Sequence, residues 1–176
     1  MNTSAESMTP LLSLQDFDDS SCLIYGIGNI GRQDDGLGWT FIDWLENSSL
    51  CTNAEIMRHY QLHLEDADLI SHKQKVLFID ASKNPDLECF QIEKLSPKLD
   101  FSFTSHAISI PSIMATCEQC FNHLPQVYLL TIRGYEWNLQ EGLTPPAKNN
   151  LTKTIEFLLN PSHLIHTESP HEKTRQ

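Results

Sequence analysis

The sequence predicts an α/β fold, a three-layer sandwich in which a mostly parallel, twisted five-stranded sheet has helices on both faces. Short apolar segments typical of buried strands alternate along the chain with segments whose apolar residues recur at helical spacing. The length of 176 residues corresponds to about one domain. A hydrophobic fraction of 40% is enough to form a core without disulfide bonds.

Five segments are expected to form strands. Residues 22–25 and 76–79 are wholly apolar, which is typical of buried strands, and residues 88–93 alternate between apolar and polar, which favours a half-exposed edge strand. The other two expected strands cover residues 54–62 and 127–132. A parallel sheet needs helical connections between such strands.

Four segments show the apolar spacing of helices, at residues 37–45, 64–70, 110–124 and 147–158. The second has carboxylates in its first turn, where the helix dipole favours them. The third tolerates Pro111 in its first turn. Residues 21–160 contain no repeat or linker and are expected to form one domain.

The two ends of the chain differ from this domain. Residues 1–20 carry acidic side chains and no Lys or Arg, which predicts a flexible acidic leader. Residues 161–176 lack apolar periodicity and are expected to form a flexible polar tail.

Charge and composition exclude several classes of partner. Twelve Lys and Arg against 23 Asp and Glu give a formal charge of −11, which disfavours binding to nucleic acid or to an anionic membrane. No apolar run is long enough to span a membrane, and no secretory signal is present. We therefore expect a cytoplasmic protein. A monomer is the default expectation for a chain of this size.

The five cysteines are expected to be free thiols, because no export signal is present. Cys117 and Cys120 have the spacing of half a zinc site or a redox motif. Both lie on the apolar stripe of the helix expected at 110–124, and no second cysteine pair could complete a zinc shell. Buried core thiols are the favoured interpretation.

A glycine-rich loop, Gly26–Gly31, follows the first strand and matches the G-x-G-x-x-G pattern of dinucleotide-binding proteins. Two observations disfavour that function. The second expected strand does not end in the acidic residue that would bind a ribose hydroxyl. Asp34 and Asp35 also lie where a pyrophosphate would approach, and their charge would repel it.

Carboxylates and an imidazole follow the expected strands. Open α/β sheets bind ligands at the carboxyl ends of their strands, where Asp34 and Asp35, Asp80 and His106 would lie. Each has a simpler alternative: a helix cap for the first two, an ion pair with Lys83 for Asp80, and a capping or surface role for His106. Together they form a mixed oxygen and nitrogen set that suits a divalent metal with open coordination positions.

The motifs that carry these residues resemble those of the [NiFe]-hydrogenase maturation endopeptidases. They are Gly26–Gly38, Ile79-Asp80-Ala81, Ser105-His106, and Gly134 with the segment Glu141–Pro145. The family fold is a twisted five-stranded sheet between helices. Its members cleave a C-terminal peptide from the hydrogenase large-subunit precursor after nickel has been inserted.

The resemblance implies roles for individual residues. Asp35, Asp80 and His106 match the family positions that recognise nickel and support cleavage, with the nickel supplied by the precursor and no permanent cofactor. Asp34 is expected to orient the loop instead. Asn29 and Gln61 could bind the substrate backbone, although Asn29 could equally stabilise its own turn.

Two features depart from the family pattern. The first acidic ligand is often Glu in the family and is Asp35 here, and the segment Tyr60–Glu65 resembles the branch that serves cytoplasmic NAD-reducing hydrogenases.

Alternative functions are a non-catalytic chaperone that binds the precursor, a peptidyl-tRNA hydrolase and a dinucleotide-binding protein. The peptidyl-tRNA hydrolase is disfavoured because residues 32–45 contain no His.

Overall fold

The computed structural model describes residues 12–99 and 108–161. Its strands are β1 (Cys22–Ile27), β2 (Glu55–His59), β3 (Lys75–Ser82), β4 (Phe90–Lys94) and β5 (Gln126–Arg133). Its α-helices are α1 (Leu37–Ser48), α2 (Asp66–Ser71), α3 (Ile110–Phe121) and α4 (Pro145–Leu159). Two 3-10 segments precede β1 and α1, namely η1 (Leu14–Phe17) and η2 (Ile30–Gly36).

The strands form one sheet in the order β2-β1-β3-β5-β4. All neighbouring pairs are parallel except β4 with β5. Because β4 comes last in this order, the antiparallel strand lies at an edge of the sheet. The exposed fraction of side chains on β4 is higher than on the central strands, as expected for an edge strand.

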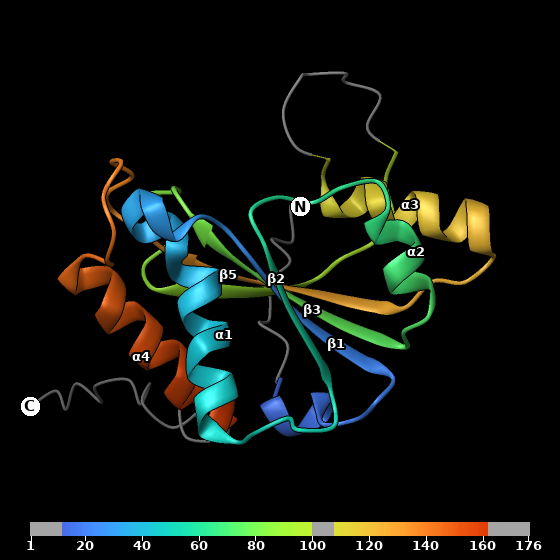
Figure 1. Ribbon diagram of the computed structural model, residues 1–176, viewed down its shortest axis with the longest axis horizontal. Coiled ribbons are helices and arrows are strands. Elements are labelled where there is room, and N and C mark those ends of the chain that lie inside the picture. The colour runs from blue at the N-terminus through green and yellow to red at the C-terminus, as the bar shows by residue number, and fades with distance from the viewer. Residues whose placement is uncertain (1–11, 100–107, 162–176) are drawn as a thin grey trace, which may run out of the picture.

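Helices cover both faces of the sheet (Figure 1). One core cluster joins side chains of η1, α1 and α4 to one face, and the other joins α2 and α3 to the opposite face. Because both faces are covered, β1 is buried along its whole length. The predicted three-layer α/β sandwich with a mostly parallel five-stranded sheet is confirmed.

The prediction of a flexible leader over residues 1–20 is wrong for its second half. Ser13 caps η1 in a reciprocal capping box with Asp16. The side chains of Leu12, Leu14 and Phe17 are buried in the core beside α1 and α4. Burial of these apolar side chains offsets the conformational entropy that is lost when the segment becomes ordered. The acidic composition of the segment did not indicate this burial. Residues 1–11 and 162–176 lie outside the described part of the chain.

Two elements are shorter than predicted. The strand expected over 54–62 spans only β2, and the helix expected over 110–124 ends at Phe121 because Asn122 adopts a left-handed φ of 51°.

Burial along α3 ends at Cys117, so the expectation of two buried thiols is wrong for Cys120, which is exposed. All five cysteines are free thiols. Among the described helices, none is long and apolar enough to cross a membrane.

Candidate active site

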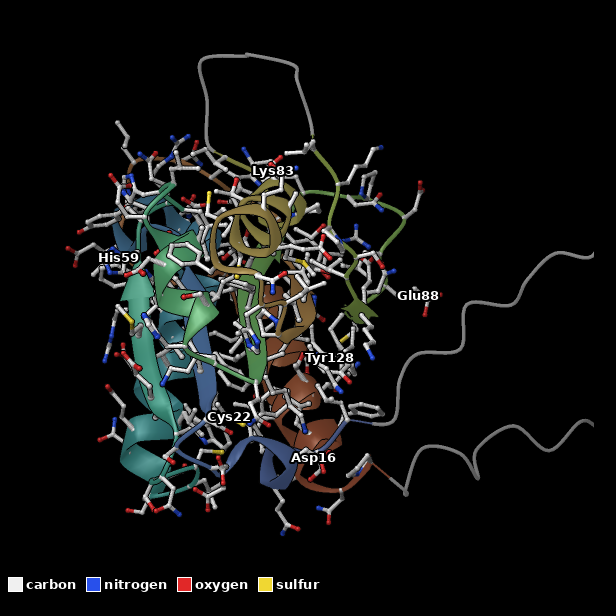
Figure 2. All side chains as sticks on the ribbon, turned by 90° about the vertical axis from the view of Figure 1, so that its right-hand side faces the viewer. Asp16, Cys22, His59, Lys83, Glu88 and Tyr128 are labelled. Carbon is white, nitrogen blue, oxygen red and sulfur yellow. The ribbon has the colours of Figure 1, made fainter. Side chains whose placement is uncertain are left out.

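The carboxyl ends of the parallel strands lie together at one edge of the sheet. Asp80 lies near the end of β3, opposite Thr131 of β5 in the strand register. Asp35 lies in η2, the segment that follows β1. Figure 2 shows His59 and Lys83, from the ends of β2 and β3, toward one end of the molecule, with Cys22 and Asp16 toward the other.

Glycines allow η2 and α1 to pack directly on these strand ends. A Cβ atom at Gly28, where φ is +134°, would lie 1.9 Å from the carbonyl oxygen of Asp35. A Cβ atom at Gly38 would lie 2.6 Å from the carbonyl oxygen of Ile79, the residue before Asp80. The backbone N–H of Asn29 donates to the Asp35 carbonyl at 3.1 Å. The glycine-rich loop therefore brings the turn carrying Asp35 against the ends of β1 and β3.

The carboxyl group of Asp80 is largely buried and lies within the electrostatic influence of Asp35. Burial, together with the negative charge of Asp35, raises the pKa of Asp80 to about 6, against the lowering effect of the hydrogen bond from the Ala81 N–H. That N–H donates to Asp80 Oδ1 at 2.7 Å. The charge of Asp35 therefore contributes to the raised pKa of Asp80, while burial is the larger cause.

Burial also raises the pKa of Asp35, while the charges of Arg32 and Lys83 and the backbone N–H of Asn29 act in the opposite direction. A buried carboxylate favours a cation nearby, because desolvation penalises its charged form. The site therefore combines two partly desolvated carboxyl groups with few compensating charges.

The alternative of an Asp80–Lys83 ion pair is not what the structure shows. Lys83 Nζ lies 4.7 Å from the centre of the Trp137 ring, in a cation–π contact. Among the described residues, no ion pair involves Asp35 or Asp80. Both carboxylates thus remain without a salt-bridge partner in the described part of the chain.

Asp34, adjacent to Asp35 in sequence, has an entirely different environment. Its side chain is fully buried. Its carboxylate accepts hydrogen bonds from the N–H groups of Tyr135 and Glu136 at 2.8 and 3.1 Å, and from the N–H and hydroxyl of Thr144, both at 2.7 Å. The expectation that Asp34 orients the loop is confirmed.

Gln33 and Thr144 hold the loop that carries Asp35, and sequence reasoning assigned neither a role. Gln33 is buried in a left-handed conformation with φ 48°. Its backbone N–H donates to the Gln140 carbonyl at 2.7 Å, and its side-chain amide bonds Glu136 and Asn138. An open hollow of about 450 Å³ lies between these residues and the start of α4, and neither Asp35 nor Asp80 lines it. The segment Glu141–Pro145 is one of the motifs that carry the family resemblance, and the Thr-Pro-Pro sequence at 144–146 is a typical helix start, but neither pattern assigned a role to Thr144.

The remaining predicted residues have different outcomes. The side-chain oxygen of Asn29 accepts from the N–H of Gly31 at 2.9 Å, so this residue stabilises its own turn. Gln61 is exposed on the segment after β2. His106 lies outside the described residues. Within the described ranges, no group of three or more His, Cys, Asp or Glu side chains is arranged to hold a metal ion.

The comparisons with known proteins agree with the motifs. No protein-family model matches the chain. A putative hydrogenase maturation protease of Methanocaldococcus jannaschii is 26% identical over 151 residues, which cover 78% of this chain and 93% of that protein.

Solved structures of similar fold carry the same description. The [NiFe] hydrogenase maturation protease HycI of Thermococcus kodakarensis has a TM-score of 0.62 at 18% identity, covering 83% of this chain and 96% of that one. The hydrogenase maturating endopeptidase HybD of E. coli has a TM-score of 0.60 at 17% identity, covering 78% and 89%. The resemblance indicated by the sequence motifs is confirmed: in sequence and in fold, the chain is similar to the hydrogenase maturation proteases.

Proposed function

We propose that this protein is an endopeptidase that removes a C-terminal peptide from the nickel-loaded large-subunit precursor of a [NiFe]-hydrogenase. The similarity to hydrogenase maturation proteases in sequence and fold supports the reaction class. The single observation that carries the assignment to a site is the packing of the turn that carries Asp35 against the ends of β1 and β3, the strand that carries Asp80. It brings together two residues from separate motifs, 45 positions apart, at the edge where open α/β sheets bind ligands.

The chemistry of the two carboxyl groups fits a cation brought by the substrate. Both are partly desolvated, and neither has an ion-pair partner among the described residues. A divalent cation beside them would relieve the repulsion between their charges and favour their ionised forms. Carboxylate oxygens with an imidazole nitrogen form a ligand set suited to a borderline divalent metal.

In the proposed reaction, Asp35, Asp80 and His106 complete the coordination of nickel that precursor cysteinates already hold. The nickel belongs to the substrate, and the chain has no permanent cofactor. The metal, or a water that it activates, would polarise the scissile carbonyl or supply hydroxide. Cleavage would then depend on the presence of nickel, so the peptidase would act only on completed precursors.

The decisive experiment incubates the purified protein with nickel-loaded and nickel-free precursor and determines the product masses. We expect loss of one C-terminal peptide from the loaded precursor only, and no cleavage by a His106→Ala variant. Binding of the precursor without any cleavage would identify a maturation chaperone instead. Equal cleavage of both precursors would exclude nickel as the recognition element.

A further inference from the structure

We propose that Asp34 and Thr144 are positioning residues for the proposed peptidase, because they hold the turn that carries Asp35 against the end of β5 and the start of α4. The inference rests on the proposed function, which places Asp35 in contact with the substrate's metal. Asp34 and Thr144 would act only through Asp35.

The contact between these segments is dense. The Asp34 carboxylate accepts four hydrogen bonds, two of them from Thr144. In the opposite direction, the Asp34 N–H donates to the Glu136 carbonyl at 3.1 Å. Asp34 is fully buried and Thr144 is 9% exposed, so water has little access to compete for these bonds. We call this arrangement the Asp34–Thr144 clamp.

Close packing at Gly134 adds to the clamp. A Cβ atom at Gly134, which directly follows β5, would lie 2.8 Å from Asp34 Cβ and 2.9 Å from the Trp137 ring. Since β5 pairs with β3 up to Ser82, the clamp is attached to the strand beside the one that carries Asp80. It therefore ties the Asp35 turn to the same rigid sheet that holds the second carboxylate.

The backbone of Asp35 is consequently held on both sides. On one side, the clamp holds Asp34, the residue that precedes Asp35. On the other side, the Asn29 N–H donates a hydrogen bond to the carbonyl of Asp35 itself. The left-handed φ of Gln33 is kept in place by three hydrogen bonds to the segment after β5. Such preorganisation matters for catalysis, because reacting groups must be held within a fraction of an ångström.

The Thr144 hydroxyl offers a mild way to test this role. Thr144→Val keeps the side-chain volume and removes both the donor to Asp34 and the acceptor that caps α4 at the Ala147 N–H, whereas Thr144→Ser restores both. Thr154→Val is the matched control, because Thr154 is a fully buried threonine of α4 whose hydroxyl donates at 2.7 Å to the Asn150 carbonyl and not to Asp34.

The experiment measures kcat and KM for nickel-loaded precursor and compares the amide NMR resonances of Asp35 and Asn29 in the metal-free proteins. For Thr144→Val we expect kcat to fall about tenfold with KM within about twofold of wild type, because a small displacement of a reacting group costs rate rather than binding. The Asp35 resonance should shift or broaden. Thr144→Ser and Thr154→Val should resemble the wild type in both measurements.

The proposal is overturned if Thr144→Val and Thr154→Val have equal kcat values, or if Thr144→Val raises KM alone. If the wild-type protein cleaves no precursor, the proposed function fails on its own. The NMR comparison then decides whether the clamp fixes the Asp35 turn, and an unchanged Asp35 resonance in Thr144→Val would contradict it.

Discussion

Asp34 and Asp35 are neighbours in the sequence, yet they lie in opposite electrostatic environments. The carboxylate of Asp34 is fully buried and accepts four hydrogen bonds, so its charge is compensated by fixed donors. Asp35 is partly buried, has a raised pKa and influences the ionisation of Asp80. One carboxylate builds the loop, and the other is left available for a ligand.

This difference shows how a short turn can serve both stability and function. Satisfied buried polar groups specify a unique structure, whereas groups whose charge is poorly compensated are typical of functional sites. The glycines around the turn allow both environments to exist within two residues. Substitutions on the two sides should therefore have different consequences.

The largest effect is expected on the Asp35–Asp80 side. Asp35→Asn and Asp80→Asn should each lower the rate of precursor cleavage by about 10²–10⁴-fold, the range typical of a positioned acid or base. The free energy of unfolding should not fall, because neutral amides remove the cost of burying two like charges. Product masses over time and urea denaturation measure the two quantities. Asp86→Asn, on an exposed aspartate, is the control, and a cleavage rate near that of the control would contradict the assigned role.

The next largest effect is expected on the Asp34 side and concerns stability. Asp34→Ala leaves the buried N–H and hydroxyl of Thr144 and the partly buried N–H groups of Tyr135 and Glu136 without their acceptor. Each such loss costs about 1–3 kcal/mol before relaxation, so we expect the free energy of unfolding to fall by about 3–5 kcal/mol. Asp86→Ala should change it by less than about 0.5 kcal/mol. Similar stabilities of the two variants in urea denaturation would show that the clamp contributes little.

A smaller effect should appear in the pH dependence of stability. The folded-state pKa of Asp80, about 6, lies above its ordinary value of 3.8. Its contribution to stability is therefore fully present below about pH 3.8 and is lost as the pH rises through about 6. From pH 4 to pH 7, the wild type should lose urea resistance relative to Asp80→Asn. A difference between the two proteins that stays constant over this range would contradict the raised pKa.

The sequence predicted the parts of the fold that depend on local patterns. The apolar segments that became β1 and β3 were recognised because strands buried on both faces are continuously hydrophobic. The placement of the segments that carry Asp35 and Asp80 at one edge of the sheet followed from topology, since the carboxyl ends of parallel strands lie together. No side-chain detail was needed for that prediction.

The features that were missed depend on contacts between distant segments. Leu14 and Phe17 are buried in a single 3-10 turn, which is too short to show apolar periodicity. The hydrogen bonds of the clamp connect residues about a hundred positions apart. A pattern within one sequence window carries no information about such pairs, although Asp34 could be recognised as a residue of the loop itself.

The central claim is that Asp35 and Asp80 form one site, and an NMR titration of the Asp80 carboxyl carbon tests it most directly. In the wild-type protein, we predict an apparent pKa of about 6 for Asp80. In Asp35→Asn, the pKa of Asp80 should fall but remain above 3.8, because burial, the larger cause, is retained. An Asp80 pKa that is the same in both proteins would show that the two carboxyl groups do not share a site.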